Sequence, residues 1–109
     1  MVSLDVWLEY PGSENYVFSY NITHNLGKMA SAVGIYQALW RPEEIGVQQA
    51  KQLIPLLTEG LAKLKSDPDE YRKHNASNGW GSYEGLVEFV TSYLEACKED
   101  PEAFVTVSR

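Results

Sequence analysis

This 109-residue sequence lacks several features that would assign a protein to a class at once. It has one cysteine, Cys97, so no disulfide can form within the chain, which is typical of a reducing compartment. No apolar run approaches the ~18 residues of a membrane span, and the N-terminus has no basic and then apolar export signal. These absences predict a cytoplasmic protein that does not enter a membrane.

Positive charge is also scarce. Nine Lys and Arg residues against fifteen Asp and Glu residues give a formal net charge of −6 and a pI near 4.8. DNA and RNA are disfavoured as partners, because binding a phosphate backbone requires clustered basic side chains that displace counterions. An acidic surface is compatible with a basic protein partner, although it also keeps many small proteins soluble.

Residue types that build metal or catalytic sites are few. The two histidines, His24 and His74, do not stand in a metal-binding spacing, so neither a metal nor another cofactor is predicted. Cys97 falls near the end of a helical pattern on its apolar face, which favours a structural thiol over a nucleophile. Acidic pairs such as Glu43-Glu44 lie at expected helix ends, so none resembles a desolvated acid and base. No catalytic residue is predicted.

Alternating patterns at both ends of the chain predict a single α+β domain over residues 1–109. Residues 2–10 alternate apolar and polar side chains, with Trp7 on the polar face, and a turn separates them from a second strand whose buried face carries Tyr16 and Phe18. Residues 103–107 alternate again, and the face of Phe104 is expected to pack against the hairpin. We therefore expect a small three-stranded antiparallel sheet covered by three to four helices.

Four helices are expected between the hairpin and the closing strand, over residues 26–40, 47–64, 67–73 and 83–97. Thr23 or Asn25 is available to cap the first helix. Pro55 interrupts the second pattern, which predicts a kink or a later helix start. Asp67 and Ser82 are the expected caps of the last two helices.

Polar side chains at the start of the first helix form one candidate ligand site. Asn21, Thr23, His24 and Asn25 stand where backbone N–H groups and the helix dipole can receive an anion, and Lys28 can meet a phosphate or carboxylate. Capping by Thr23 or Asn25 is the simpler explanation of the same residues, because every helix needs a cap.

The second candidate site is the glycine-rich turn Asn78-Gly79-Trp80-Gly81-Ser82-Tyr83-Glu84-Gly85. Trp80 and Tyr83 can form an aromatic wall for a flat ligand such as a base, with Asn78 reading the polar edge of that ligand. The alternative is that Trp80 closes the end of the core while the glycines let the chain turn tightly around it. Both explanations fit the same residues.

Three segments, residues 20–26, 60–68 and 78–84, together resemble a group of small uncharacterised proteins from bacteriophages and bacteria. The likeness covers nearly the whole chain, and its most specific part is the Asn-Gly-Trp-Gly-x-Tyr-Glu segment. The resemblance implies a phage or mobile-element context but no activity. By analogy, such small acidic proteins sequester a host signalling nucleotide or block a host defence protein.

Two non-catalytic hypotheses follow. The first is a protein that binds a nucleotide-type small molecule where the two helix starts converge, within one chain or between the copies of a homodimer. The second is an acidic interaction module that inhibits a host protein through exposed aromatic side chains at Trp40, Trp80 and Tyr83.

An enzyme is the third and least favoured hypothesis. A small hydrolase acting through His24 needs a partner base or carboxylate, and the sequence places none beside it. Folding can bring Asp5 or Glu84 to that position. The location of these two carboxylates therefore tests the hypothesis.

Overall fold

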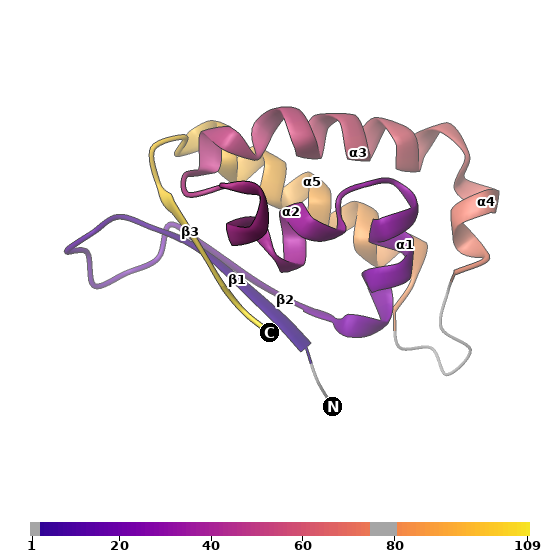
Figure 1. Cartoon of the computed structure of the whole chain (residues 1–109), viewed down its shortest axis with the longest axis horizontal. Helices are drawn as coiled ribbons and strands as arrows, with labels where there is room; N and C mark the ends of the chain where they lie inside the picture. Colours follow the sequence, from indigo (N-terminus) through magenta and orange to yellow (C-terminus); the bar gives the residue numbers. More distant parts are fainter. Residues whose placement is uncertain (1–2, 75–80) are drawn as a thin grey trace.

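The computed structural model describes residues 3–74 and 81–109. Its three strands are β1 (Ser3–Glu9), β2 (Phe18–Thr23) and β3 (Phe104–Ser108), which form one antiparallel sheet in the order β2-β1-β3. The N-terminal hairpin and the closing strand therefore share a sheet, as predicted, and β1 lies at its centre. Figure 1 shows the helices gathered on one side of this sheet.

The central strand β1 divides the structure into a buried and an outer side. Fully buried apolar side chains alternate along it with partly exposed ones, and the buried ones are Leu4, Val6 and Leu8. Trp7 belongs to the partly exposed set and lies between Ser19 of β2 and Thr106 of β3. Because successive side chains point to opposite faces of a sheet, Trp7 faces away from the helices. We call this side of the sheet the outer face.

The described residues form five α-helices, which lie on the side of the buried face: α1 (Gly27–Ala32), α2 (Tyr36–Trp40), α3 (Ile54–Ser66), α4 (Pro68–Arg72) and α5 (Tyr83–Glu99). Three short 3-10 helices accompany them, η1 (His24–Leu26), η2 (Pro42–Ile45) and η3 (Ala50–Gln52). The α5 helix contacts both β2 and α3, so it lies between the sheet and the outermost helix layer (Figure 1). The order of strands and helices gives the predicted α+β class.

Aromatic side chains join α5 to β2. Tyr93 stacks on Phe18 with their ring centroids 5.5 Å apart, and Phe89 contacts Tyr20 at 5.0 Å. Such pairs add about 0.5–1.5 kcal/mol each beyond the burial of their area. Cys97 lies one helical turn after Tyr93 and is fully buried, which agrees with the structural role predicted for it.

The expectation of one continuous helix over residues 26–40 is wrong. The chain forms a 3-10 turn and α1, breaks at residues 33–35, and resumes as α2. Gly34, in the break, has a φ of +79°, a left-handed conformation that costs other residues about 1–2 kcal/mol. The break reorients the chain so that α2 can bury Leu39 and Trp40.

Helix starts marked by proline and capping residues agree with the sequence. The α3 helix begins at Ile54, with Pro55 in its first turn, where the missing N–H removes no helical hydrogen bond. Asp67 and Ser82 cap α4 and α5, since each side chain accepts a hydrogen bond from a backbone N–H three residues later. The helical pattern over residues 47–64 thus yields a later start and not a kink.

Gly60 of α3 permits a close approach to the segment before α2. A methyl group at Gly60 would overlap Cγ2 of the buried Ile35. We expect Gly60→Ala to lower the free energy of unfolding by about 1–3 kcal/mol, because overpacking outweighs the ~1 kcal/mol that alanine gains in a helix. Denaturant unfolding measures the loss. In the double variant Gly60→Ala with Ile35→Ala, the free energy of unfolding should fall by much less than the sum of the two single losses. Strictly additive losses would contradict the close contact between the two residues.

Two buried tyrosines differ in the hydrogen bonding of their hydroxyl groups. Tyr83 donates a hydrogen bond to the Leu64 carbonyl oxygen at 2.7 Å, whereas no group among the described residues bonds to the Tyr93 hydroxyl. Burial raises the pKa of Tyr93, so this hydroxyl stays protonated. Tyr93→Phe should leave stability unchanged or raise it by about 1 kcal/mol, while Tyr83→Phe should lower it by about 1 kcal/mol.

Denaturant unfolding of the wild type and the two Phe variants measures this difference. Each substitution removes one hydroxyl from a buried ring, so each serves as the other's control. A larger loss for Tyr93→Phe than for Tyr83→Phe would mean that the Tyr93 hydroxyl is stabilised by a partner after all.

Candidate functional site

His24, which two of the hypotheses use, is tied to the core. It lies half-buried in η1, and its Nδ1 accepts a hydrogen bond from Nε1 of Trp40 at 2.6 Å. Trp40 is 1% exposed, and Tyr36 stacks on its ring with centroids 5.2 Å apart. Since the indole nitrogen can only donate, the neutral imidazole carries its proton on Nε2. His24 therefore satisfies a buried indole N–H group.

The two carboxylates that the hydrolase hypothesis considers have other partners. Asp5 accepts a hydrogen bond from Asn21 at 2.7 Å, and Glu84 accepts one from Arg72 at 2.8 Å. The Arg72 guanidinium also lowers the pKa of Glu84 and so favours its charged form. Within residues 3–74 and 81–109, no hydrogen bond or ion pair joins either carboxylate to His24. In the described part of the chain, the recorded partners of Asp5 and Glu84 are therefore Asn21 and Arg72 and not His24.

The remaining residues of the first helix start do not converge on one point. Thr23 caps η1, with its hydroxyl accepting a hydrogen bond from the N–H of Asn25 at 3.2 Å. Asn21 lies on the outer face of the sheet, where it is paired with Asp5 of β1. Lys28 is exposed on α1, which belongs to the helical side. Asn21 and Lys28 therefore lie on different surfaces of the protein.

The two predicted helix starts are nevertheless in direct contact. A Cβ at Gly81 would lie 3.1 Å from Cγ2 of Thr23 and 3.2 Å from Cδ2 of Leu26. The turn before α5 therefore packs directly on the chain that leads into η1. Asn78 and Trp80 lie outside the described residues, so their part in a ligand site stays a prediction.

The aromatic residues expected to be exposed hot spots at Trp40 and Tyr83 are buried, and that expectation is wrong. Trp40 is 1% exposed and Tyr83 is 6% exposed. The Tyr83 hydroxyl bonds to the Leu64 carbonyl, and the Arg72 guanidinium lies 4.9 Å from the centre of its ring. Both residues lie on the apolar faces of their helices, where burying a large ring stabilises the fold more than exposing it.

Exposed aromatic side chains gather instead on the outer face. Tyr16, Val17 and Phe104 are 56%, 43% and 39% exposed, and they are three of the five large apolar side chains exposed among the described residues. Trp7 contacts Tyr16 with ring centroids 5.8 Å apart. The register of β1 and β3 places Phe104 opposite Glu9, on the same face as Trp7. We call Trp7, Tyr16 and Phe104 the aromatic cluster.

Acidic side chains border the aromatic cluster. Asp5 and Glu9 flank Trp7 along β1, and their carboxylates accept hydrogen bonds from Asn21 at 2.7 Å and Thr106 at 3.4 Å. The described outer-face positions of the three strands include no Lys or Arg. A phosphate backbone would be repelled here, whereas a cationic side chain would find both carboxylates and aromatic rings.

Sequence reasoning missed this cluster because it assigned two of its members to the core. The alternating pattern places Tyr16 on the buried face with Phe18, but β2 begins only at Phe18 and Tyr16 lies in the preceding loop. Phe104 is exposed because its neighbours Val105 and Val107 take the buried face of β3. Trp7 is the signal that could have identified the cluster, since a large ring on the polar face of a strand has no core to enter.

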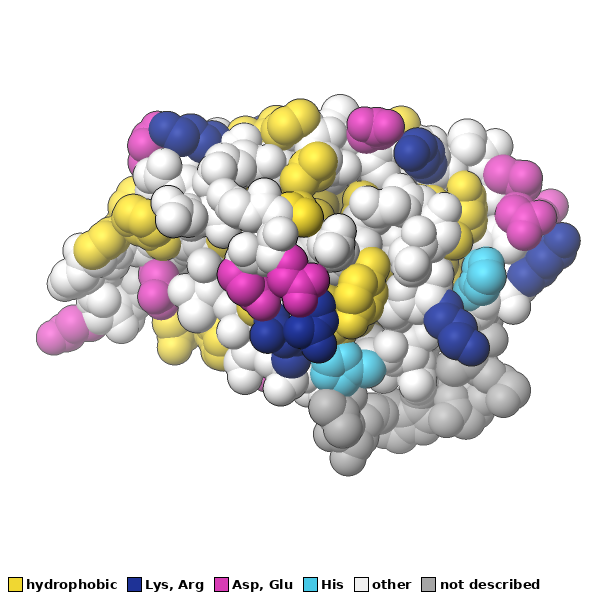
Figure 2. Space-filling model, in the orientation of Figure 1, with side chains coloured by type: hydrophobic (Ala, Val, Ile, Leu, Met, Phe, Trp, Pro, Cys, Tyr) yellow, Lys and Arg dark blue, Asp and Glu magenta, His cyan; other side chains and the backbone are white. Residues whose placement is uncertain are grey.

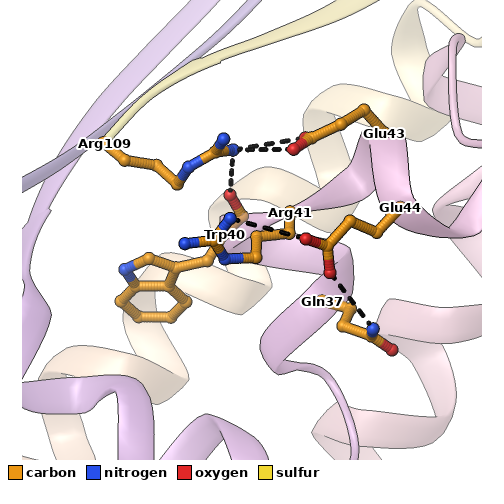
Figure 3. Close-up of polar contacts among 6 residues, drawn as sticks. All are labelled: Gln37, Trp40, Arg41, Glu43, Glu44 and Arg109. Atoms are coloured by element: carbon orange, nitrogen blue, oxygen red, sulfur yellow. Dashed lines mark hydrogen bonds and ion pairs between the residues drawn. The ribbon is translucent and has the colours of Figure 1, made fainter.

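A second polar surface lies on the helical side, but its charges are already paired (Figure 3). Arg109 donates to the Trp40 carbonyl oxygen at 2.9 Å and lies 3.0 Å from a carboxylate oxygen of Glu43. Arg41 lies 3.4 Å from Glu44. Figure 2 shows acidic and basic side chains next to each other near the centre of the view. Their mutual pairing makes the surface a weaker candidate for anion binding than the arginines alone would suggest.

Comparisons with protein family models, with curated proteins and with solved structures found no match. Among the described helices, none is both long and apolar enough to cross a membrane. The described residues also contain no group of three or more His, Cys, Asp and Glu side chains that could hold a metal ion.

The hydrogen bond between His24 and Trp40 predicts a structural cost for removing the imidazole. We expect His24→Ala to lower the free energy of unfolding by about 1–3 kcal/mol, because the buried Nε1–H of Trp40 loses its acceptor. His74→Ala, which removes another half-buried imidazole, should change stability by less than about 0.5 kcal/mol. Denaturant unfolding compares the two variants, and equal losses would contradict the structural role of His24.

Proposed function

We propose that this protein is a non-catalytic interaction module that binds a basic partner protein through the outer face of its sheet. The observation that supports the proposal is the aromatic cluster of Trp7, Tyr16 and Phe104 on a face against which no described helix packs. Trp and Tyr are enriched among the few residues that dominate binding energy in protein interfaces. Isolated exposed apolar residues are ordinary, but neighbouring ones often mark contact sites.

Charge complementarity favours a basic partner. Asp5 and Glu9 lie on either side of Trp7, and the whole chain has a net charge of −6. An Arg or Lys of the partner can stack on the Trp7 ring while it meets these carboxylates. The same charges oppose the phosphate groups of nucleic acids, although exposed aromatic rings alone would suit stacked bases.

The nucleotide hypothesis has less support from the described residues. Nδ1 of His24 is engaged by Trp40, and the Tyr83 ring is buried, so neither presents itself to a ligand as expected. Asn21 belongs to the outer face and is bonded to Asp5. Only the resemblance to phage proteins suggests that the partner is a host protein and that binding inhibits it.

The outer face can be tested with one substitution and a matched control. Trp7→Ser removes the central ring of the aromatic cluster, while Leu56→Ser removes an exposed apolar side chain, 36% exposed, from α3. Proteins captured from a bacterial lysate by the wild type should be retained by Leu56→Ser and lost by Trp7→Ser. For an identified partner, we expect Trp7→Ser to weaken binding by about 2 kcal/mol or more.

Ionic strength and fold integrity complete this experiment. Binding to a basic surface should weaken as salt is added, because the carboxylates beside Trp7 are exposed to screening. Denaturant unfolding checks that Trp7→Ser remains folded, and Phe104→Ser provides a second variant on the same face. The proposal would be contradicted by partners that bind the wild type and Trp7→Ser with equal affinity, or whose affinity does not change with ionic strength.

A further inference from the structure

A groove runs along the edge of the sheet formed by β3, opposite the edge formed by β2. Its volume is about 530 Å³, and it is lined by β3 on one side and by residues 42–47 on the other. The apolar side chains of the groove are Pro42, Val47, Val105 and Val107. Glu43 and Arg109, whose ion pair is drawn in Figure 3, also line it.

The first half of this edge is already paired with another part of the chain. The N–H of Ala50 donates to the Ala103 carbonyl at 2.8 Å, and the N–H of Val105 donates to the Gln48 carbonyl at 2.9 Å. Backbone groups two residues apart in a strand point the same way, so the N–H and C=O of Val107 also point away from β1. Among residues 3–74 and 81–109, neither group of Val107 has a hydrogen-bond partner on that side.

The groove fits a single extended strand better than the edge of a second sheet. Residues 48–50 run antiparallel to β3, with Gln49 opposite Phe104, and a strand that follows the same path reaches Val107. Residues 42–47 border the groove on the side away from β3. If the β3 strand of a second copy followed this path, the β1 strand paired with it would collide with residues 42–47. Two copies would also repel each other, because each has a net charge of −6.

We propose that the open end of β3 binds an extended segment of a partner protein by strand addition. The segment exchanges backbone hydrogen bonds with Val107, and its residue opposite Val107 shares the face of that side chain. Val47 and Pro42 line the groove beside Val107, so an aliphatic side chain of the segment fits there. The proposal does not depend on the outer face, because it rests on the backbone of β3 and not on the aromatic cluster.

Selection of short random peptides against the whole chain tests the proposal. We expect the selected peptides to be rich in Val and Ile and to bind Val107→Pro about tenfold more weakly, because proline removes an N–H that faces the groove. Proline is tolerated on an edge strand where the N–H points outward, so β1 keeps its bonds to β3. Trp7→Ser, which alters only the outer face, should bind the same peptides as the wild type.

Amide hydrogen exchange of the wild-type chain gives a second measurement that needs no variant. A bound peptide should slow exchange at Val107 and leave Ser108, which the strand alternation directs toward β1, nearly unchanged. Three results would overturn the proposal: no peptide is enriched, the peptides bind Val107→Pro as well as the wild type, or Trp7→Ser abolishes their binding. A dimer of the free chain that Val107→Pro dissociates would also overturn it, by assigning the edge to a second copy.

Discussion

One-sided burial of the central strand is the constraint on which the rest of the structure depends. Leu4, Val6 and Leu8 are fully buried from a strand that is paired on both of its edges. Their alternation with Asp5 and Trp7 means that only one face of the sheet can receive a helix layer. The α-helices of the described residues therefore all lie on that face (Figure 1), and none of them covers the outer face.

Local signals in the sequence predict the strands and most helix starts, because their causes are local. Alternation needs only neighbouring residues, and the caps at Asp67 and Ser82 and the start near Pro55 need only the next turn. The break at Gly34 does not follow from local signals alone. The apolar spacing over residues 26–40 suits one long helix or two short ones, and the close contact between Ile35 and Gly60 of α3 is part of the arrangement that favours two.

The candidate site was harder to predict because its contacts join residues that are distant in the sequence. His24 meets Trp40, and Tyr83 meets Leu64, so two residues chosen for their chemistry are used to satisfy buried polar groups. The aromatic cluster combines one residue from the centre of the sheet, one from a loop and one from the closing strand. Within it, the unusual position of Trp7 could be recognised from the sequence, whereas the exposure of Phe104 depends on which face of β3 is buried.

The buried thiol of Cys97 can report the opening of the core. The side chain is fully buried on α5, and burial raises the pKa of Cys97 to about 12, so the thiol is neither charged nor accessible while α5 stays docked. A thiol reagent can reach it only after the packing around α5 opens. The rate at which a thiol reagent labels Cys97 in the wild-type chain therefore depends on the opening of the core.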